Sequence, residues 1–231
     1  MEKFEQEKER EVYHAKIDFF TNVAHEIRTP LTLIKGPLEN IILKKQVDAE
    51  TREDLNVMKQ NTERLLNLTN QLLDFRKTES QGFRLNFAKC NITEVLKETH
   101  VRFTSLAKQK GLDFTLQVPE KDFYAHVNQE AFTKIISNLL NNGMKYAESY
   151  VHVMLEAPQR DDNNLFRIRT VNDGVIIPDA MKEEIFKPFV RFNEQEDGKV
   201  TTGTGIGLAL SRSLAEFHLG TLVMEAGEES N

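Results

Sequence analysis

The sequence lacks the features that would place it outside a cell or across a membrane. It contains a single cysteine, Cys90, which excludes an intrachain disulfide and fits a reducing compartment. No apolar run approaches the roughly 18–20 residues needed to span a bilayer. The N-terminus carries no charged segment followed by an apolar stretch, so no secretory signal is indicated. Together these absences predict a soluble, intracellular chain.

An excess of positive charge is also missing. The chain has 30 Lys and Arg against 36 Asp and Glu, which gives a formal net charge of −6. This balance argues against a nucleic-acid binder that neutralises phosphates with a basic face. The length of 231 residues is short for two domains of ordinary size and long for one. The 39% of apolar residues are enough to form a small hydrophobic core.

The first third of the chain has the periodicity of two helices. Residues 1–16 are densely charged and contain no Gly or Pro, which predicts a solvated helix whose abrupt start suggests a piece of a longer protein. Two stripes with steps of three and four then flank a polar loop at 44–50, and Asp48 or Thr51 is expected to cap the second helix. The stripe positions are Val12, Ala15, Phe19, Val23, Ile27, Leu31, Ile34, Leu38 and Ile41, then Leu55, Met58, Thr62, Leu65, Thr69 and Leu72. A hairpin with one apolar face cannot bury it alone, so we expect a homodimeric four-helix bundle.

His25 stands off the first stripe. It lies two residues from both Val23 and Ile27, about 200° around a helix, so it should point away from the apolar face. Glu26 follows it, and Thr29 lies one turn further on the same surface. A zinc site of the H-E-x-x-H type is excluded because position 29 is Thr.

Two interpretations of this helix remain open. Pro30 has no N–H for the carbonyl of Glu26, so we expect a bend or a loosened turn beside His25. His25 is then either an exposed histidine next to a tolerated proline or a nucleophile. In the second case the Glu26 carboxylate would hold the other ring N–H and raise the basicity of the imidazole.

From about residue 86 short strands alternate with helices, which predicts a mixed α/β domain of about 145 residues. The expected strands are Asp113–Val118, Tyr150–Leu155, Leu165–Val171 and Thr221–Ala226. The expected helices are Ile92–Lys110, Glu130–Tyr146 and Ile206–Phe217.

Polar residues in this second region suit a nucleotide. Asn138 and Asn142 share one helix face with Lys145 close by, and two amide oxygens with an ammonium suit a magnesium–triphosphate. The further pieces are a polar turn at 171–178, an aromatic segment with one Arg at 185–192, a lid-like polar stretch at 193–202, and glycines at Gly203, Gly205 and Gly207. Alternate glycines before a helix let backbone N–H groups approach a phosphate. Each piece alone also fits a polar helix face, a strand-end turn or a packing cluster.

The order of these pieces strongly resembles the transmitter core of bacterial sensor histidine kinases. Residues 19–31, FFTNVAHEIRTPL, are similar almost letter for letter to that family's phosphoacceptor box. Residues 33–39, LIKGPLE, further resemble the hybrid sensor kinases, which carry a receiver domain on the same polypeptide. The resemblance extends over nearly the whole chain.

The resemblance implies a dimerisation and phosphotransfer hairpin at 1–85 and a catalytic ATP-binding domain at 86–231. The fold class would be α plus α/β: a hairpin that dimerises into a four-helix bundle, followed by an α/β sandwich of the GHKL (Bergerat) type. A hinge near 80–88 would swing the second domain onto the first. The implied cofactors are ATP and Mg²⁺. The implied partners are a second copy and a response-regulator receiver domain, separate or on the same full-length chain, but no nucleic acid. The segment would be the cytoplasmic portion of an inner-membrane sensor, attached to the membrane only through an upstream region.

Individual roles follow from the same resemblance. His25 would accept the phosphoryl group and Glu26 would be its acid/base partner. Thr29 would position water to dephosphorylate the regulator, and Arg191 would reach the γ-phosphate. The implied nucleotide-site residues are Asn138 and Asn142, which also form the Mg²⁺ site, then Lys145 at a phosphate, Tyr146 on the adenine, and Asn172, Asp173, Gly174, Gly203, Thr204, Gly205, Gly207 and Leu208.

The chain departs from the family pattern in three places. The family's adenine-reading turn is D-x-G-x-G, but on alignment at Pro178 the aspartate is replaced by Asn172 and the second glycine by Ile176. Either Asn172, whose amide oxygen accepts without charge, or Asp173 would read the base. Asn128 stands where the family commonly has Asp. At residues 227–231 the family normally has a second glycine and a final strand, so an edge of the sheet is expected to be missing.

The hypothesis is therefore ATP-dependent autophosphorylation on His25 and phosphotransfer to a receiver aspartate. One alternative is a dimeric scaffold with a degraded nucleotide site, which the turn at 172–176 favours. A second is an ATPase or chaperone of the same nucleotide-binding superfamily, which the His25–Glu26 helix disfavours. A third is a transmitter dominated by phosphatase activity that depends on Thr29.

Overall fold

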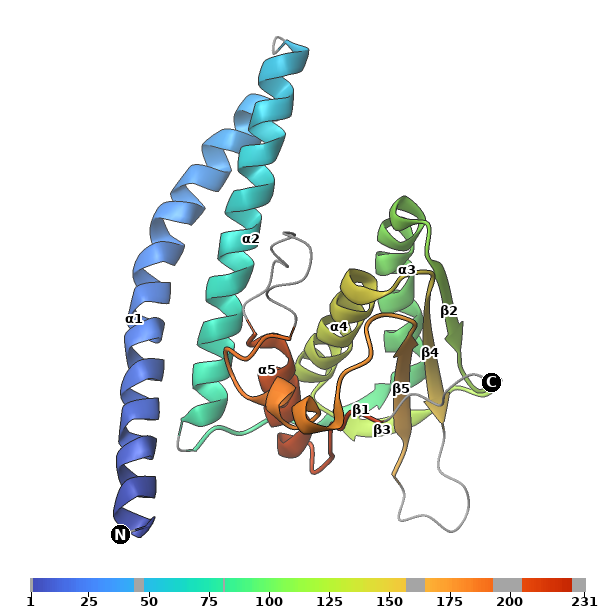
Figure 1. Ribbon diagram of the computed structural model, residues 1–231. Coiled ribbons are helices and arrows are strands. Elements are labelled where there is room, and N and C mark those ends of the chain that lie inside the picture. The colour runs from blue at the N-terminus through green and yellow to red at the C-terminus, as the bar shows by residue number, and fades with distance from the viewer. Residues whose placement is uncertain (1, 44–47, 81, 157–164, 193–204, 226–231) are drawn as a thin grey trace. The chain divides into compact units, whose positions relative to one another are not determined.

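The computed structural model describes residues 2–43, 48–80, 82–156, 165–192 and 205–225 (Figure 1). The chain divides into two compact units, residues 1–83 and residues 84–231. The predicted fold class, a helical hairpin followed by an α/β domain, is confirmed. No helix among the described residues is long and apolar enough to cross a membrane.

The first unit is a hairpin of two long helices, α1 (Glu2–Leu43) and α2 (Ala49–Glu79). Asp48 caps α2, since its side chain accepts from the backbone N–H of Thr51 at 2.8 Å. α1 is continuous through Pro30 and Pro37, and its upper part leans away from its lower part in Figure 1. The expected disturbance at the prolines is therefore a change of direction and not a break in the helix.

The buried positions of the hairpin follow a seven-residue spacing. On α1 these are Ile17, Ala24, Leu31 and Leu38, each at most 8% exposed. They face Leu55, Thr62 and Thr69 of α2, also seven apart, whose side chains are at most 9% exposed. The hydroxyls of Thr62 and Thr69 donate to carbonyls of their own helix, which satisfies them inside the seam.

The second unit is an α/β sandwich. Its elements are β1 (Ala88–Asn91), α3 (Ile92–Lys110), β2 (Asp113–Gln117), β3 (Tyr124–Val127), α4 (Gln129–Tyr146), β4 (Tyr150–Glu156), β5 (Arg167–Asn172), the short 3-10 helices η1 (Asp179–Met181) and η2 (Glu184–Phe186), and α5 (Gly207–Phe217). The main sheet has the order β2-β4-β5, with β2 parallel and β5 antiparallel to β4, and β1 pairs with β3 in a separate antiparallel ribbon.

The core of this unit lies between the main sheet and the helices α3 and α4, which cover one face of it in Figure 1. Val151, Val153 and Leu155 alternate along β4 and point into this core. They meet Leu140 and Met144 of α4, which are both 1% exposed. Because α4 is anchored in the core along its length, the polar side chains on its other face are held in fixed positions.

Two sequence expectations about strands were wrong. β1 and β3, each four residues long, were not predicted. The strand expected at Thr221–Ala226 does not form in its described part, residues 221–225. There the carbonyl of Leu222 accepts from Arg212 Nε at 3.1 Å, and Glu225 pairs with Arg169 at 2.6 Å, so side chains hold this segment in place of a ladder. Residue 226 and the missing edge expected at 227–231 lie outside the described residues.

Candidate functional site

His25 lies on the outside of α1, as the sequence predicted. Ala24 and Leu31 occupy the buried seam, which turns the neighbouring positions outward. His25, Glu26 and Thr29 are all exposed. A histidine in this position is accessible to a macromolecule or a nucleotide that approaches the hairpin from its side.

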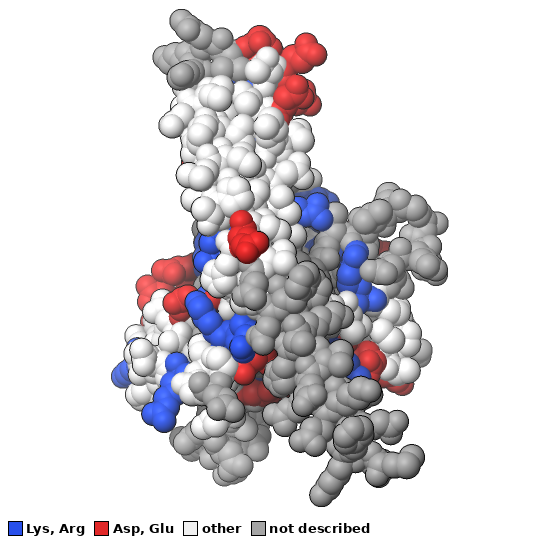
Figure 2. All heavy atoms as spheres, turned by 90° about the vertical axis from the view of Figure 1, so that its left-hand side faces the viewer, with Lys and Arg blue, Asp and Glu red and all other residues white. Residues whose placement is uncertain are grey.

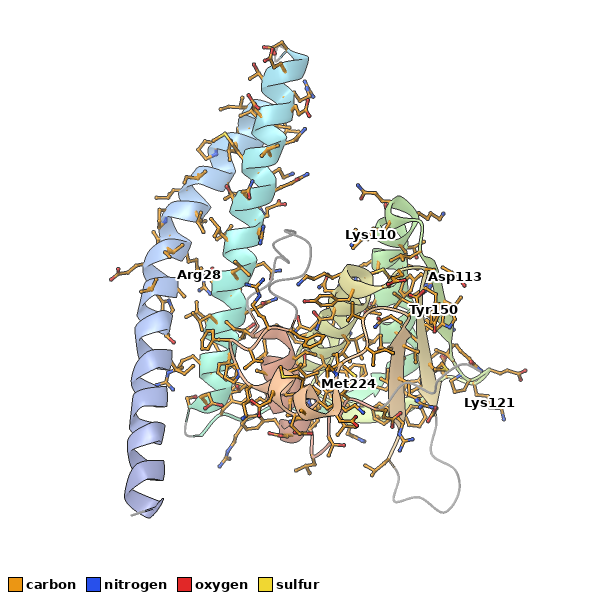
Figure 3. The ribbon with its side chains drawn as sticks, viewed as in Figure 1. Arg28, Lys110, Asp113, Lys121, Tyr150 and Met224 are labelled. Carbon is orange, nitrogen blue, oxygen red and sulfur yellow. The ribbon has the colours of Figure 1, made fainter. Side chains whose placement is uncertain are left out.

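Sequence reasoning missed the arginine one turn from His25. Arg28 reaches across the hairpin and donates from Nη2 to Asn70 Oδ1 of α2 at 2.7 Å (Figure 3). Its Nε is buried and has no hydrogen-bond partner among the described residues. The sequence does contain a signal that could have drawn attention to Arg28. It lies three residues after His25, and residues three apart are neighbours on one face of a helix.

A pocket of about 200 Å³ opens beside His25 within the hairpin. Three of its lining residues, Arg28, Arg76 and Lys77, are cationic, and the others are Thr21, His25, Leu73 and Ser80. Guanidinium and ammonium groups are the side chains that hold phosphate and carboxylate groups. The electrostatics around His25 therefore favour an anion.

The polar face of α4 forms the centre of a second constellation, in the α/β unit. Asn128 caps α4 by accepting from the N–H of Ala131 at 2.9 Å, so the amide replaces the family's aspartate in this role. Asn142 is half-buried, and its side chain makes no hydrogen bond with another described residue. Lys145 donates to the hydroxyl of Tyr146 at 2.6 Å, and its ammonium also lies over the Tyr146 ring. Both side chains are thus oriented at the C-terminal end of α4.

Asn138 joins α4 to the start of α5. Its Nδ2 donates to the carbonyl of Gly207 at 3.3 Å and to the hydroxyl of Ser211 at 3.2 Å. Ser211 is fully buried, and this partner was not identified from the sequence. The amide of Asn138 is therefore used for structure, whereas the amide oxygen of Asn142 fits a hard cation such as Mg²⁺. No cluster of three or more His, Cys, Asp or Glu that suits a metal occurs in the described part of the chain.

The turn after β5 packs against the C-terminal end of α4. Gly174 lies so close to the backbone carbonyl of Tyr146 that a Cβ at this position would clash with it. The backbone N–H of Gly174 donates to Asn172 Oδ1 at 3.0 Å. Gly174 thus lies beside Tyr146, and the side chain of Asn172 is bound to Gly174.

Asp173 is occupied elsewhere. Its carboxylate accepts from the backbone N–H groups of Glu148, Ser149 and Tyr150 at 2.9–3.1 Å and from the Ser149 hydroxyl. These bonds hold the pKa of Asp173 far below its usual range, first through the Ser149 hydroxyl and then through the backbone N–H groups. The Asp173 carboxylate therefore anchors the loop before β4. The side chain of Asn172, the other residue that was considered for contact with the base, is exposed.

The glycine-rich segment meets the aromatic segment. Gly205 has φ +69°, and a Cβ there would lie 2.7 Å from the carbonyl oxygen of Val190. The N–H of Phe189 donates to the Gly205 carbonyl at 3.0 Å, and Arg191 follows, half-buried. Gly207 and Leu208 begin α5. Gly203, Thr204 and the lid-like stretch 193–202 lie outside the described residues.

Arg212 of α5, which the sequence did not single out, holds η2 in place. Its guanidinium lies 3.6 Å from the centroid of the Phe186 ring and pairs with Glu183 at 2.7 Å. Close contacts and hydrogen bonds thus connect α4 with the turn after β5 and with the start of α5, and Gly205 with the aromatic segment.

Two family descriptions match the chain in succession. "His Kinase A (phospho-acceptor) domain" matches residues 15–81, and "Histidine kinase-, DNA gyrase B-, and HSP90-like ATPase" matches residues 127–230. The first range contains His25, Glu26 and Thr29. The second contains every residue of the constellation in the α/β unit.

Individual proteins agree with these descriptions. Histidine kinase P4 of Formosa agariphila is 33% identical over 224 residues, which cover 96% of this chain and 16% of that protein. Hybrid signal transduction histidine kinase D of Dictyostelium discoideum is 34% identical over 224 residues, which cover 94% of this chain and 14% of that protein. The crystal structure of histidine kinase ThkA in complex with response regulator protein TrrA matches with a TM-score of 0.61 and 25% identity, over 98% of this chain and 63% of that one. The chain thus spans no more than about a sixth of the length of the first two relatives.

Proposed function

Because the chain belongs to the sensor histidine kinases of two-component signal transduction, we propose that it phosphorylates itself on His25 with ATP and passes the phosphoryl group to an aspartate of a receiver domain. The observation that carries this proposal is the exposed His25–Glu26 pair on a helical hairpin, in one chain with a domain whose polar residues converge on α4. The ATPase description of that domain supports ATP as the phosphoryl donor.

The transfer follows from the chemistry of the two groups. A ring nitrogen of His25 attacks the γ-phosphorus, the bond from that phosphorus to the β–γ bridging oxygen breaks, and ADP leaves with the electron pair. Glu26 holds the proton on the other ring nitrogen while positive charge develops on the imidazole. The cations of the pocket beside His25, Arg28 foremost, attract the incoming phosphoryl oxygens. Positioning and charge neutralisation carry most of the rate.

The nucleotide site is assigned on the same basis. Asn142 is the candidate ligand for Mg²⁺, which when bound would neutralise phosphate charge. Lys145 contacts a phosphate, Tyr146 packs on the base, and Arg191 reaches the γ-phosphate. The N-terminus of α5, with Gly205 and Gly207 before it, presents backbone N–H groups to phosphate oxygens.

Phosphorylation with γ-labelled ATP and Mg²⁺ tests the proposal. The wild-type chain should acquire a label that is lost in acid and stable in base, and His25→Ala should abolish it. The matched control is His126→Ala, an exposed histidine of β3, which should keep the label. A label that survives His25→Ala would overturn the proposal.

A second row of apolar side chains on the hairpin, here called the second seam, supports the proposed homodimer. Ile27, Ile34 and Ile41 repeat at seven residues on α1, as Met58 and Leu65 do on α2, and all five are 40–52% exposed in the single chain. This is the spacing of a coiled-coil face without its partner. Figure 2 shows that the upper part of the hairpin carries few charged side chains on the face turned to the viewer. A second copy of the hairpin, packed on these positions, completes a four-helix bundle.

The receiver partner and the phosphatase activity are proposed on further grounds. The name of the Dictyostelium relative and the complex of ThkA with TrrA support a receiver domain, on the same chain or separate, as the acceptor. Thr29 is exposed one turn beyond His25, where its hydroxyl can orient a water toward a phosphorylated aspartate. Thr29→Ala should therefore slow regulator dephosphorylation and leave autophosphorylation largely intact. Attachment to an inner-membrane sensor stays a prediction.

A further inference from the structure

An uncharged side chain holds the arginine beside His25. The amide oxygen Oδ1 of Asn70, on α2, accepts from Arg28 Nη2 at 2.7 Å. Arg28 forms no ion pair with a carboxylate in the described part of the chain. An amide oxygen can orient a guanidinium through a hydrogen bond without cancelling its charge. The cation next to His25 is therefore held in place and keeps its full positive charge.

A second cation of the same pocket is arranged differently. Lys77 Nζ lies 3.6 Å from Oδ1 of Asp74, three residues earlier on α2. That carboxylate offsets part of the charge of the ammonium. Arg28, in contrast, still has an unused donor, because its buried Nε has no hydrogen-bond partner among the described residues. Of these two cations, Arg28 is the better prepared to take a new anionic partner.

The position of Arg28 relative to His25 fits a phosphoryl group as that partner. The two residues are three apart on one face of α1 and line the same pocket. A guanidinium binds two oxygens of a phosphoryl group at once when its plane has the right orientation. A carboxylate at residue 70 would itself pair with Arg28 and compete with those oxygens. A neutral acceptor at this position avoids the competition.

We propose that Asn70 is a positioning residue for autophosphorylation: its amide orients the Arg28 guanidinium beside His25 and leaves the charge of that group available to the phosphoryl oxygens. The inference rests on the proposed function and deepens it, because it assigns the orientation of Arg28 to a residue of the other helix. A charge that is already oriented stabilises the transition state without reorganisation when the phosphoryl group arrives. The role requires both the hydrogen bond and the neutrality of residue 70.

Two substitutions separate these requirements. Asn70→Ala removes the acceptor, whereas Asn70→Asp keeps an acceptor of the same size and cancels the charge of Arg28. The initial rate of autophosphorylation is measured on the full chain at saturating ATP with Mg²⁺, and ATP affinity is measured by calorimetry. Both variants should lower the rate by about tenfold or more. ATP affinity should stay unchanged, because the proposed nucleotide site lies in the other unit. A purely structural role of Asn70 predicts the wild-type rate for Asn70→Asp, since the bond between the helices is kept.

Asn67→Asp is the matched control, because it introduces the same charge at an exposed position of α2 one turn earlier. Its rate should equal that of the wild type. A wild-type rate in either Asn70 variant, or an equal loss in Asn67→Asp, overturns the inference while the kinase function stands. Absence of any label on the wild-type chain overturns the proposed function and the inference with it.

Discussion

At the scale of single residues, two adjacent side chains in the turn after β5 have separate tasks. Asp173 accepts hydrogen bonds from three backbone N–H groups and one hydroxyl, and so ties the end of β5 to the loop that leads into β4. The side chain of Asn172 is exposed and accepts from the backbone N–H of Gly174. The sequence left open which of the two reads the base, because the spacing of the turn is compatible with either. The structure shows that the Asp173 carboxylate is already bound by residues 148–150.

Asp173→Asn should destabilise the α/β unit in a pH-dependent way. The folded-state pKa of Asp173 lies below the unfolded value of about 3.9, so its stabilisation is complete above that value and is lost as the pH falls from about 4 toward the folded pKa. The free energy of unfolding in urea should be lower in the variant at pH 7, and the difference should shrink at pH 3. Asp54→Asn, at an exposed position of α2, serves as the control with the same loss of charge. A difference of equal size at both pH values would contradict the assignment.

The limits of the sequence are visible at this scale. The histidine box, the two asparagines of α4 and the glycine-rich turn could be found because their residue types and spacing carry the signal. The partners of Arg28 and Ser211 could not be found in this way, because Asn70 and Asn138 lie 42 and 73 residues away. A hydrogen bond between helices leaves no periodic trace in the sequence.

At the scale of elements, α4 organises the α/β unit. One face packs into the core through Leu140 and Met144, and the other carries the polar side chains. Asn138 connects it to α5, and the carbonyl of Tyr146 touches the turn after β5. Two segments that lie far from α4 in the sequence, the start of α5 and the turn after β5, are thereby held on this helix.

Asn138→Ala should lower the free energy of unfolding of the α/β unit by about 1–2 kcal/mol, because the buried hydroxyl of Ser211 and the carbonyl of Gly207 lose a donor. Asn141→Ala is the matched control: it removes the same amide from an exposed position of the same helix and should change stability by less than about 0.5 kcal/mol. Urea unfolding followed by circular dichroism measures both. Equal effects of the two substitutions would refute a special role for the link to α5.

The elements themselves were predictable where they are long. The α-helices α3, α4 and α5 begin and end within one residue of their expected bounds. An apolar pattern that repeats over several helical turns is a strong signal in the sequence. β1 and β3 were missed because a four-residue strand carries only two residues per face. The expected strand from Thr221 failed because alternation alone does not supply a pairing partner.

At the scale of the whole molecule, the hairpin has two seams and a single chain buries only one. The buried seam contains small and polar side chains such as Ala24, Thr62 and Thr69, whereas the exposed one consists of Ile, Met and Leu. The buried seam also contains Ile17, Leu31, Leu38 and Leu55, so it differs from the exposed one by its small and polar members and not by a lack of large apolar side chains. The sequence predicted this need for a partner from the pattern but could not separate the two seams.

Ile34→Glu should weaken the proposed dimer, because two carboxylates would be buried in the seam for each pair of chains. Analytical ultracentrifugation at micromolar concentration should show a dissociation constant raised by at least about tenfold. Leu33→Glu is the control: Leu33 is 71% exposed and lies beside, not in, the second seam. If the Leu33 variant dissociates to the same extent, the interface lies elsewhere.

The position of both anchors on α4 has a consequence for the length of that helix. Asn138, which binds the start of α5, and Tyr146, which touches the base-binding turn, are eight residues apart, or about 12 Å along the axis at about 1.5 Å per residue. In the proposed nucleotide site, α4 would thus set the distance between the phosphate end and the base end of the nucleotide. Loss or gain of one residue between them would change this spacing by about 1.5 Å and rotate one end by about 100° relative to the other. Relatives that keep the nucleotide site are therefore expected to keep the length of this segment.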